Sequence, residues 1–450
     1  MTLVLPGSAQ LVAGDKRVGR VALRVWAGLL AVVAFLALLG WLWPGLAFWL
    51  AADTGMLGLF RWVLTGLAVG WALLFVDAWR LGEPLGLLRQ QRLAVVGING
   101  VLCFSVAGTL LFGAHLLTVQ RDFVLTMFGD GVVREATDGR YNVLLLGGDS
   151  GAARWGMRPD SLTLASIDEE TGQTTLFGLP RNMQNFPFPE GSVMGGQFPD
   201  GFDCDDCYLN SLATWARDNE DLFTEYDDPG IQATVEGVEG ITGLEVNYFA
   251  MVNLAGFRRM VDALGGVELD VRDRIPIGGI GAPVTGYIEA GRRTLDGFET
   301  LWFARSRVAA DDYSRMARQK CVMNAMLDQL SPAKVLRKFE AITSASSDLI
   351  TTDLPASELD TFAQLALRAR TQPMRTVSFV PPKVNTSAPD VEAIHADVRS
   401  ALEEARERPR ADRPPRRKKP VVTSTQTGGS IGSLKDGYAA NDTDDLDAVC

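Results

Sequence analysis

NVLLLGGDS, residues 142–150, is a short apolar run that ends in glycine, aspartate and serine. An apolar run of this length with a turn signal behind it is typical of a buried strand that delivers a loop. Two further apolar runs, Ser161–Ile167 and Thr174–Leu179, are joined by the turn-rich segment DEETGQ. Their lengths and this connection predict a hairpin of two strands.

Helical and strand patterns alternate downstream of this hairpin. Helical periodicity covers Gly230–Ile241, Leu254–Leu264, Tyr313–Leu330 and Asp390–Ala405, and strand patterns cover Val246–Ala250, Val267–Val271 and residues 376–382. Residues 190–229, rich in glycine, aspartate, proline and aromatic residues, indicate a long surface excursion. Alternation of this kind predicts an α/β sandwich built on a central sheet.

Three long apolar runs precede this region: Val21–Trp43, Met56–Val76 and Leu93–Val119. At about 1.5 Å per residue, each is long enough to cross a hydrocarbon core of about 30 Å. The alternative, three buried helices of a soluble core, is disfavoured because core helices are rarely apolar on every face.

The basic residues around these runs orient them. Lys16, Arg17, Arg20 and Arg24 precede or open the first run, and Arg80, Arg89 and Arg92 lie between the second and the third. The loop after the first run has no basic residue before Arg61. By the positive-inside rule the N-terminus is cytoplasmic and the chain beyond about residue 120 is outside. No small-residue cleavage site follows the first run, so we expect an uncleaved plasma-membrane anchor of three transmembrane helices.

This topology predicts four parts. They are a cytoplasmic N-terminus at 1–20, a membrane domain at 21–119, an extracytoplasmic domain at 120–405 and a tail at 406–450. The tail begins RERPRADRPPRRKKP and continues in serine, threonine, glycine and aspartate, a composition that cannot form a core, so we expect disorder. A second interpretation is weak attachment of its basic half to anionic wall polymer or lipid headgroups.

Two cysteines stand close together in DCDDC, at Cys204 and Cys207. Their spacing is compatible with zinc, but no second pair of cysteines or histidines accompanies them. An oxidising location outside the cell favours a local Cys204–Cys207 disulfide instead.

The candidate chemistry depends on carboxylates, because the chain has only two histidines, His115 and His395, and neither is near a motif-bearing loop. This argues against a Ser-His-Asp or Cys-His hydrolase. Asp149 follows the first strand and Asp160 opens the next. Carboxylates at such junctions face the crevice where ligands bind, and their oxygens suit Mg²⁺ or Mn²⁺. The alternative role for each is simple turn formation.

Arginines gather around the same junctions. Arg158 stands beside Asp160, and Arg181 follows a strand in GLPRN. Arg305 and Arg307 are separated by one residue, so their side chains share one face if the chain there is extended.

The next helix adds Arg315 and Gln319, which share a face because they are four residues apart. Clustered arginines beside metal-type carboxylates, in a chain of net charge −11, predict a pyrophosphate ligand or, alternatively, an exposed charged face. A nucleic-acid reader would need a general positive balance, so no nucleic-acid partner is expected.

The segments NVLLLGGDS, RPDSLTLASID, TTLFGLPRN, FRRMVDALGGVELDV, LDGFETLWFARSR and DDYSRMARQ occur in the order seen in the LytR-CpsA-Psr family of wall glycopolymer ligases. The chain resembles this family over roughly residues 138–345. The resemblance implies an α/β/α sandwich with a central mixed sheet and a deep pocket for a polyprenyl pyrophosphate lipid. It also implies transfer of a glycopolymer phosphate from that membrane lipid to a peptidoglycan hydroxyl, with release of polyprenyl phosphate.

The resemblance assigns roles by motif. It implies a metal-associated pair, Asp149 and Asp160, and places Asp312 in the pyrophosphate site. An acceptor hydroxyl would benefit from a nearby carboxylate base, for which Asp149 and Asp312 are both candidates. The implied pyrophosphate ligands are Arg158, Arg181, Arg305, Arg307, Arg315 and Gln319. Arg318 is not marked by the motif and is expected to tolerate lysine or glutamine. Asn182 stands where many members have aspartate, and three spans replace the usual one.

Two other functions remain open from the sequence. One is a lipid-pyrophosphate hydrolase that uses water as the acceptor on the same site. The other is a non-catalytic envelope regulator or scaffold.

Overall fold

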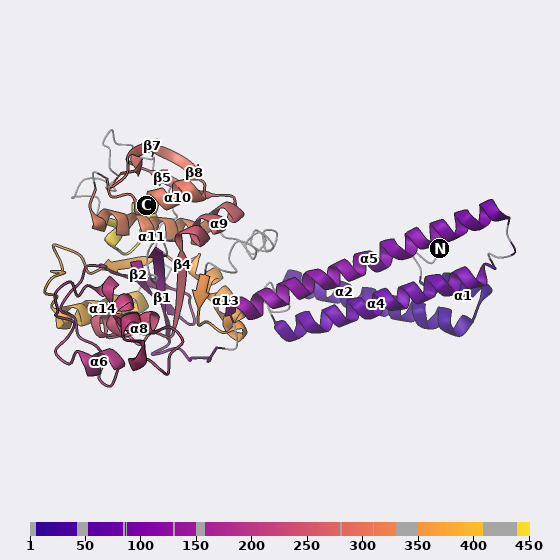
Figure 1. Cartoon of the computed structure of the whole chain (residues 1–450), viewed down its shortest axis with the longest axis horizontal. Coiled ribbons are helices and arrows are strands. Elements are labelled where there is room, and N and C mark those ends of the chain that lie inside the picture. The colour runs from indigo at the N-terminus through magenta and orange to yellow at the C-terminus, as the bar shows by residue number, and fades with distance from the viewer. Residues whose placement is uncertain are drawn as a thin grey trace. The chain divides into compact units, whose positions relative to one another are not determined.

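The computed structural model describes residues 6–42, 53–83, 86, 88–128, 131–149, 158–279, 281–308, 310–329, 350–407 and 439–450. The chain forms two compact units. One comprises Met1–Asp130 with Pro355–Asp360, and the other comprises Gly131–Leu354 with Thr361–Cys450. Figure 1 labels many of the elements of both units.

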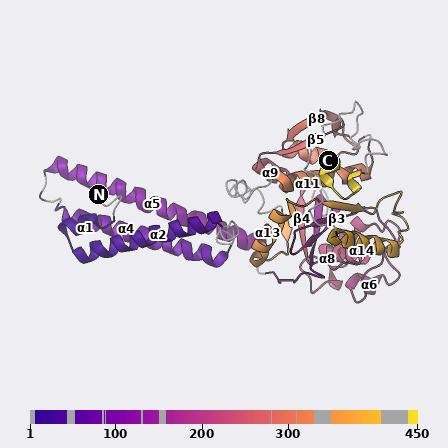
Figure 2. The ribbon, with the colours of Figure 1, turned by 180° about the vertical axis from the view of Figure 1, so that it is seen from behind.

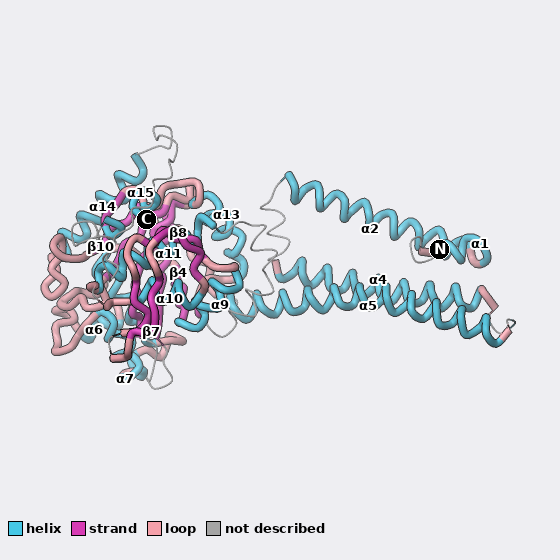
Figure 3. The backbone as a smooth tube through the Cα atoms, turned by 90° about the horizontal axis from the view of Figure 1, so that it is seen from above, coloured by secondary structure: helices cyan, strands magenta, loops and turns pink. Residues whose placement is uncertain are grey.

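The first unit is helical. Its helices are α1 (Ser8–Ala13), α2 (Lys16–Leu42), α4 (Thr54–Leu81), α5 (Arg89–Phe128) and the short η4 (Ala356–Glu358). Among the described residues, Lys16–Leu36, Thr54–Leu81 and Arg89–Asp122 are long and apolar enough to cross a membrane. The predicted spans fall on these helices, and α4 and α5 lie side by side (Figure 3). Helix α5 continues to Phe128, so the domain boundary expected at residue 120 falls inside a helix instead of at its end.

The described residues of the second unit form a seven-stranded sheet in the order β11-β10-β3-β2-β1-β4-β9. The strands are β1 (Arg140–Asp149), β2 (Arg158–Asp168), β3 (Thr174–Leu179), β4 (Tyr248–Asn253), β9 (Ile350–Thr352), β10 (Arg375–Ser378) and β11 (Asp442–Thr443). The β1–β4 and β3–β10 pairs are parallel, whereas the other neighbours are antiparallel. The sheet is therefore mixed, as expected.

Alternation along the strands buries both faces of this sheet. Leu144 and Leu146 pack into a core with α8 (Pro229–Thr242) and α14 (Val391–Glu407), which lie together beside β3 in Figure 2. Leu145 packs on the opposite face, in the cluster to which α11 (Asp312–Gln329) contributes. On that face Tyr141 also contacts Phe362 of α13 (Leu359–Ala369). Helices thus cover both faces, which confirms the α/β/α sandwich.

The predicted surface excursion at 190–229 is only partly correct. It contains α6 (Val193–Gln197), η2 (Leu209–Ser211), α7 (Leu212–Asp218) and η3 (Glu220–Leu222). Two of its aromatic side chains enter the core, Phe202 and Phe223, and each is 1% exposed. Burial of aromatic surface stabilises this segment more than its glycine and aspartate content suggests.

Two small sheets stand beside α11. They pair β5 (Val267–Val271) with β8 (Gly291–Leu295), and β6 (Ile275–Gly278) with β7 (Val284–Ile288). Helices α9 (Leu254–Leu264) and α10 (Gly297–Arg305) join them around a second core cluster that contains Val261, Phe303 and Val322.

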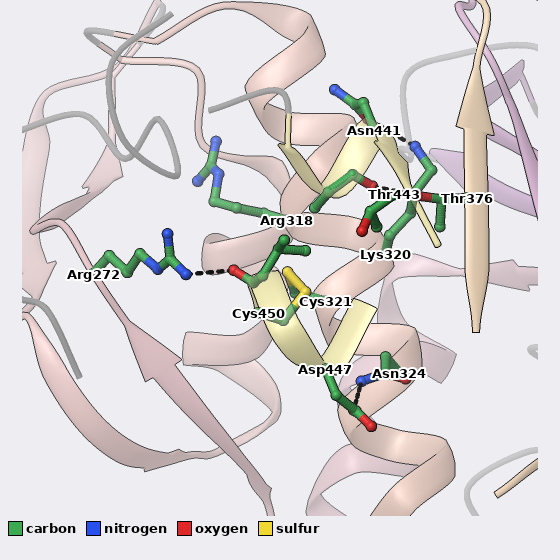
Figure 4. Close-up of a disulfide and its surroundings, with 12 residues drawn as sticks. Arg272, Arg318, Lys320, Cys321, Asn324, Thr376, Asn441, Thr443, Asp447 and Cys450 are labelled. Atoms are coloured by element: carbon green, nitrogen blue, oxygen red, sulfur yellow. Dashed lines mark hydrogen bonds between the residues drawn. A yellow bond between two sulfur atoms is a disulfide. The ribbon is translucent and has the colours of Figure 1, made fainter. Parts of the chain in front are cut away.

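The prediction of a disordered tail over 406–450 is wrong for the residues described at its two ends. Helix α14 continues to Glu407, and the chain ends in η6 (Ala439–Asn441), β11 and α15 (Leu446–Val449). Cys450 is joined by a disulfide to Cys321 of α11 (Figure 4). The composition of the tail does not predict this order, because the C-terminal segment is held by one disulfide and a few hydrogen bonds and not by a core of its own. Residues 408–438 lie outside the described part of the structure.

Candidate functional site

The candidate site lies at one end of the large sheet. Strands β1 and β3 both run antiparallel to β2, so they point in the same direction. The end of β1 at Asp149, the start of β2 at Arg158 and the turn after β3 at Arg181 therefore meet at one edge. Carboxyl ends of strands are where α/β sheets bind their ligands.

A β-bulge shapes this edge. Gly147 pairs with Ser161 and Gly148 pairs with Pro159, so Asp160 is an extra residue in β2 with no partner in β1. Bulges bend a strand and re-aim a side chain, and they are common beside active sites. Here the bulged residue is one of the two predicted metal-associated carboxylates.

Five charged side chains form what we call the arginine cluster: Asp160, Arg181, Arg307, Asp312 and Arg315. Arg181 donates to Asp160 Oδ1 over 2.6 Å and lies 3.7 Å from Asp312. Arg315 binds Asp312 with two nitrogens, at 3.1 and 2.9 Å, and donates to the backbone carbonyl of Asp160. Arg307 is 3.7 Å from Asp312. Segments far apart in the sequence thus converge on two carboxylates.

Gln319 and Arg158 border the arginine cluster. Gln319 accepts a hydrogen bond from the Ser161 hydroxyl over 2.9 Å and donates to the Ala304 carbonyl. Arg158 donates to Asn210 Oδ1 over 3.3 Å. Gln319 therefore ties α11 to both β2 and the end of α10.

The structure does not bring Arg305 into the cluster. Helix α10 continues through Arg305, so the extended chain expected at this point begins only at Ser306. The Arg305 side chain is exposed and lies over the ring of Trp302, at 5.2 Å from its centroid. Arg305 and Arg307 consequently do not share one face.

The environment of Arg318 argues against the expected tolerance of lysine or glutamine at this position. Its side chain is 1% exposed and donates to the backbone carbonyls of Phe303, Ser306 and Ser314. Burial, together with repulsion from neighbouring Arg315, lowers the pKa of Arg318 to about 9. Arg318 joins the end of α10 to α11 and thereby fixes the loop that carries Arg307.

Electrostatics make the arginine cluster receptive to an anion. Three guanidiniums face two carboxylates, and burial followed by repulsion from Arg181 lowers the pKa of Arg307. Burial acts to raise the pKa of Asp312, but Arg315, Arg181 and Arg307 together hold that pKa below its ordinary value. Asp312 is therefore ionised and engaged, which suits it to orienting arginines and makes it a weak general base.

The residues present are compatible with a magnesium ion only together with a phosphate ligand. The side chain of Asp149 lies outside the described part of the structure. Among the described residues no group of three acidic, histidine or cysteine side chains is placed to hold a metal. Mg²⁺ needs only one or two carboxylates when substrate phosphates supply further oxygens. Asp160 supplies one such carboxylate, at an edge whose guanidiniums have a geometry suited to phosphate oxygens.

The structure contains the disulfide Cys204–Cys207 that the sequence favoured over zinc. Cys207 is 6% exposed and belongs to the main core cluster. Cys207 therefore anchors the 190–229 segment to the main core, and both sulfur atoms are used in the disulfide and not in a metal site.

Sequence reasoning missed three polar neighbours of the site. Ser161 positions Gln319, and its place directly after Asp160 is a usable signal. Asn210 binds Arg158 from within the 190–229 segment, where no pattern marked it. Lys320 is 1% exposed and donates to Ser378 and Asn441, and nothing in an amphipathic pattern indicates a buried amine.

The sequence model of the LytR_cpsA_psr family matches residues 122–394, which is more than half of the chain. The chain belongs to the LytR_cpsA_psr family. The site residues described above lie within the matched segment.

Two similar proteins have names that refer to the cell wall or its polymers. The cell wall biosynthesis protein LcpA of Corynebacterium glutamicum is 29% identical to this chain over 240 residues. The aligned part is 46% of this chain and 44% of LcpA, so the chain spans less than half the length of LcpA. TagU of Enterococcus faecalis, a polyisoprenyl-teichoic acid–peptidoglycan teichoic acid transferase, is 26% identical over 62% of this chain and 80% of TagU. A crystal structure of Bacillus subtilis TagV aligns with 61% of this chain and with 99% of the TagV chain. The sequence identity is 20% and the TM-score is 0.43.

Proposed function

We propose that this protein transfers a glycopolymer phosphate from a polyprenyl pyrophosphate-linked precursor to a hydroxyl of peptidoglycan, forming a phosphodiester and releasing polyprenyl phosphate. The arginine cluster carries the proposal. Three guanidiniums held by two carboxylates at the end of the sheet leave a surplus of positive charge for a pyrophosphate. Membership of the family and the transferase activity named for TagU of Enterococcus faecalis support the same reaction class.

Phosphoryl transfer depends mainly on positioning and on neutralising oxygens as the leaving phosphate departs. Arg181, Arg307 and Arg315 present fork-shaped donors that fit phosphate oxygens. Asp312 orients these forks before the substrate arrives. A bound Mg²⁺, held through Asp160 and Asp149, would neutralise further charge on the pyrophosphate. The acceptor hydroxyl loses its proton to a base, and we assign that role to Asp149 because Asp312 is engaged by arginines.

The proposed reaction requires the second unit to lie outside the plasma membrane, where peptidoglycan is. The basic residues around the candidate spans support this topology, because they place the loop between α4 and α5 in the cytoplasm. A reporter joined at Asp138 should be active outside the cell only. A cytoplasmic signal would overturn the proposal, since enzyme and acceptor would then be on opposite sides of the membrane.

The reaction is tested with the full chain in lipid vesicles, a lipid-linked donor whose glycan is labelled, and peptidoglycan fragments. Label should become linked to peptidoglycan through phosphate, and a chelator or Arg181→Ala should abolish the transfer. Arg274→Ala, an exposed residue of the β6 region, is the control. Label released only as free glycan phosphate would indicate a hydrolase, and absence of both products would indicate a non-catalytic protein.

A further inference from the structure

Four side chains on the surface of α9 and α10 alternate between guanidinium and aromatic ring. Arg258 lies over Phe298 at 5.2 Å from the ring centroid, Phe298 meets Trp302 edge-on at 6.3 Å, and Arg305 lies over Trp302 at 5.2 Å. We call Arg258, Phe298, Trp302 and Arg305 the α10 strip. Its contacts are continuous from one end to the other.

The register of α10 places the strip on the outer face of the helix. Phe298, Trp302 and Arg305 follow one another at intervals of four and three residues, so they share one face. Thr300, Leu301 and Phe303 are buried on the inner side. Phe298 is 38% exposed and Arg258 and Arg305 are exposed. The strip extends about 10 Å along the helix axis, from seven residues of rise.

One end of the strip adjoins the arginine cluster. Arg305 is the last residue of α10, and Arg307 of the cluster follows two positions later. Gln319 and Arg318 hold the carbonyls of Ala304 and Phe303 in the same turn of α10. Because Arg305 and Arg307 lie on different faces, a glycan that leaves a pyrophosphate bound at the cluster would reach the strip around the C-terminal end of α10.

The charge of the strip favours an anionic partner. Within the described residues neither Arg258 nor Arg305 has a carboxylate partner. The nearest carboxylates along α10, Asp296 and Glu299, are used in the capping box at its first turn. Guanidiniums stacked on rings keep their edge nitrogens available for phosphate oxygens.

We propose that the α10 strip binds the phosphate-bearing glycan of the donor, beyond its pyrophosphate. This proposal rests on the proposed function and names the part of the substrate that the strip recognises. Apolar faces of sugar rings pack on Phe298 and Trp302, because large aromatic side chains offer apolar area with little conformational cost. Arg258 and Arg305 then pair with phosphates of successive repeats.

The test measures binding to the full chain in detergent, without acceptor, for two probes. One is a lipid pyrophosphate that carries a single neutral sugar, and the other carries a chain of sugar phosphates. Trp302 also packs against the core, so the decisive variants are Phe298→Ala and Arg258→Gln. The matched controls are Tyr287→Ala and Arg274→Gln, an exposed ring and guanidinium 3.7 Å apart on another element.

Each decisive variant should weaken binding of the sugar-phosphate probe by about tenfold, the effect of losing roughly one charged hydrogen bond or one packed ring. The affinity of the decisive variants for the single-sugar probe should change by less than about twofold. The affinity of the control variants for both probes should also change by less than about twofold. Equal affinity of native and variant proteins for the long probe would overturn the proposal, as would an equal loss for both probes. Absence of binding of either probe by the native chain would instead defeat the proposed function, and the strip proposal with it.

Discussion

Arg318 on α11 donates a hydrogen bond of 2.7 Å to the backbone carbonyl of Phe303, one turn before a second acceptor, the carbonyl of Ser306. Helices end with carbonyls that lack partners inside the helix, and a basic side chain can satisfy them. Arg318 performs this role for α10 while fully buried. The position of Arg307 in the arginine cluster therefore depends on a residue outside it.

Replacement of Arg318 by glutamine should destabilise the fold severely. It leaves carbonyls of Phe303 and Ser306 without a donor, and each unsatisfied buried group costs roughly 1–3 kcal/mol. Urea unfolding of the full chain in detergent measures the loss. Arg305→Gln, on an exposed neighbour, should change stability by less than about 0.5 kcal/mol. Equal stability of the two variants would show that the α10–α11 connection does not depend on Arg318.

Arg307→Lys and Arg181→Lys should slow transfer by about ten- to a hundredfold, because lysine retains the charge but loses the fork that binds two phosphate oxygens. Their unfolding midpoints should change little, since without substrate these guanidiniums partly repel one another. Single-turnover transfer and thermal unfolding are measured on the same preparations. Unchanged transfer with reduced stability would mean that Asp312 and its arginines form an architectural network only.

Much of this site could be predicted from sequence, because strand ends and turn residues are local signals. The hairpin, α9 and β5 occur at the expected residues, and Asp160, Arg181 and Arg315 converge as the motifs implied. What the sequence could not provide is the direction of side chains that depends on tertiary packing. Arg305 and Arg318 differ by thirteen positions and look alike in composition, yet one is exposed on a ring and the other is buried under a helix end.

The buried amine of Lys320 should make stability depend on pH. Burial, together with repulsion from Arg315, lowers the pKa of Lys320 from 10.5 to about 7. Between pH 7 and 10.5 the Lys320 amine is protonated in the unfolded chain and neutral in the folded chain, so the free energy of unfolding rises with pH through this range. Below pH 7 the amine is protonated in both states, and the fold bears the full cost of burying its charge.

Lys320→Met should remove that dependence. Between pH 7 and 9 the native protein should gain on the order of 1 kcal/mol per pH unit relative to the variant. The comparison uses urea unfolding at both pH values, with Lys383→Met as the control at an exposed, ion-paired lysine. A native-minus-variant difference that is flat across the window would show that Lys320 stays charged in the fold, stabilised by the oxygens of Ser378 and Asn441.

The Cys321–Cys450 disulfide should contribute far more stability than Cys204–Cys207. In the chain-entropy description, a cross-link between residues 129 positions apart restricts the unfolded chain by about 5 kcal/mol, whereas one across 3 positions restricts it by roughly 1.5 kcal/mol. The decrease in the free energy of unfolding should thus be severalfold larger for Cys450→Ser than for Cys204→Ser.

The contacts around Cys450 refine this expectation. Val449 accepts a hydrogen bond from Arg272, just after β5, and Asp447 accepts one from Asn324 of α11, so the C-terminal segment keeps both partners after the disulfide is lost (Figure 4). Asn441 also accepts a hydrogen bond from Lys320 and donates one to the Tyr313 carbonyl at the start of α11.

If these bonds suffice to hold the segment, Cys450→Ser destabilises the chain but leaves Arg315 in place, and transfer at low temperature remains near that of the native protein. If transfer falls in parallel with stability, the disulfide itself positions α11. Equal destabilisation by Cys450→Ser and Cys204→Ser would contradict the loop-length argument altogether.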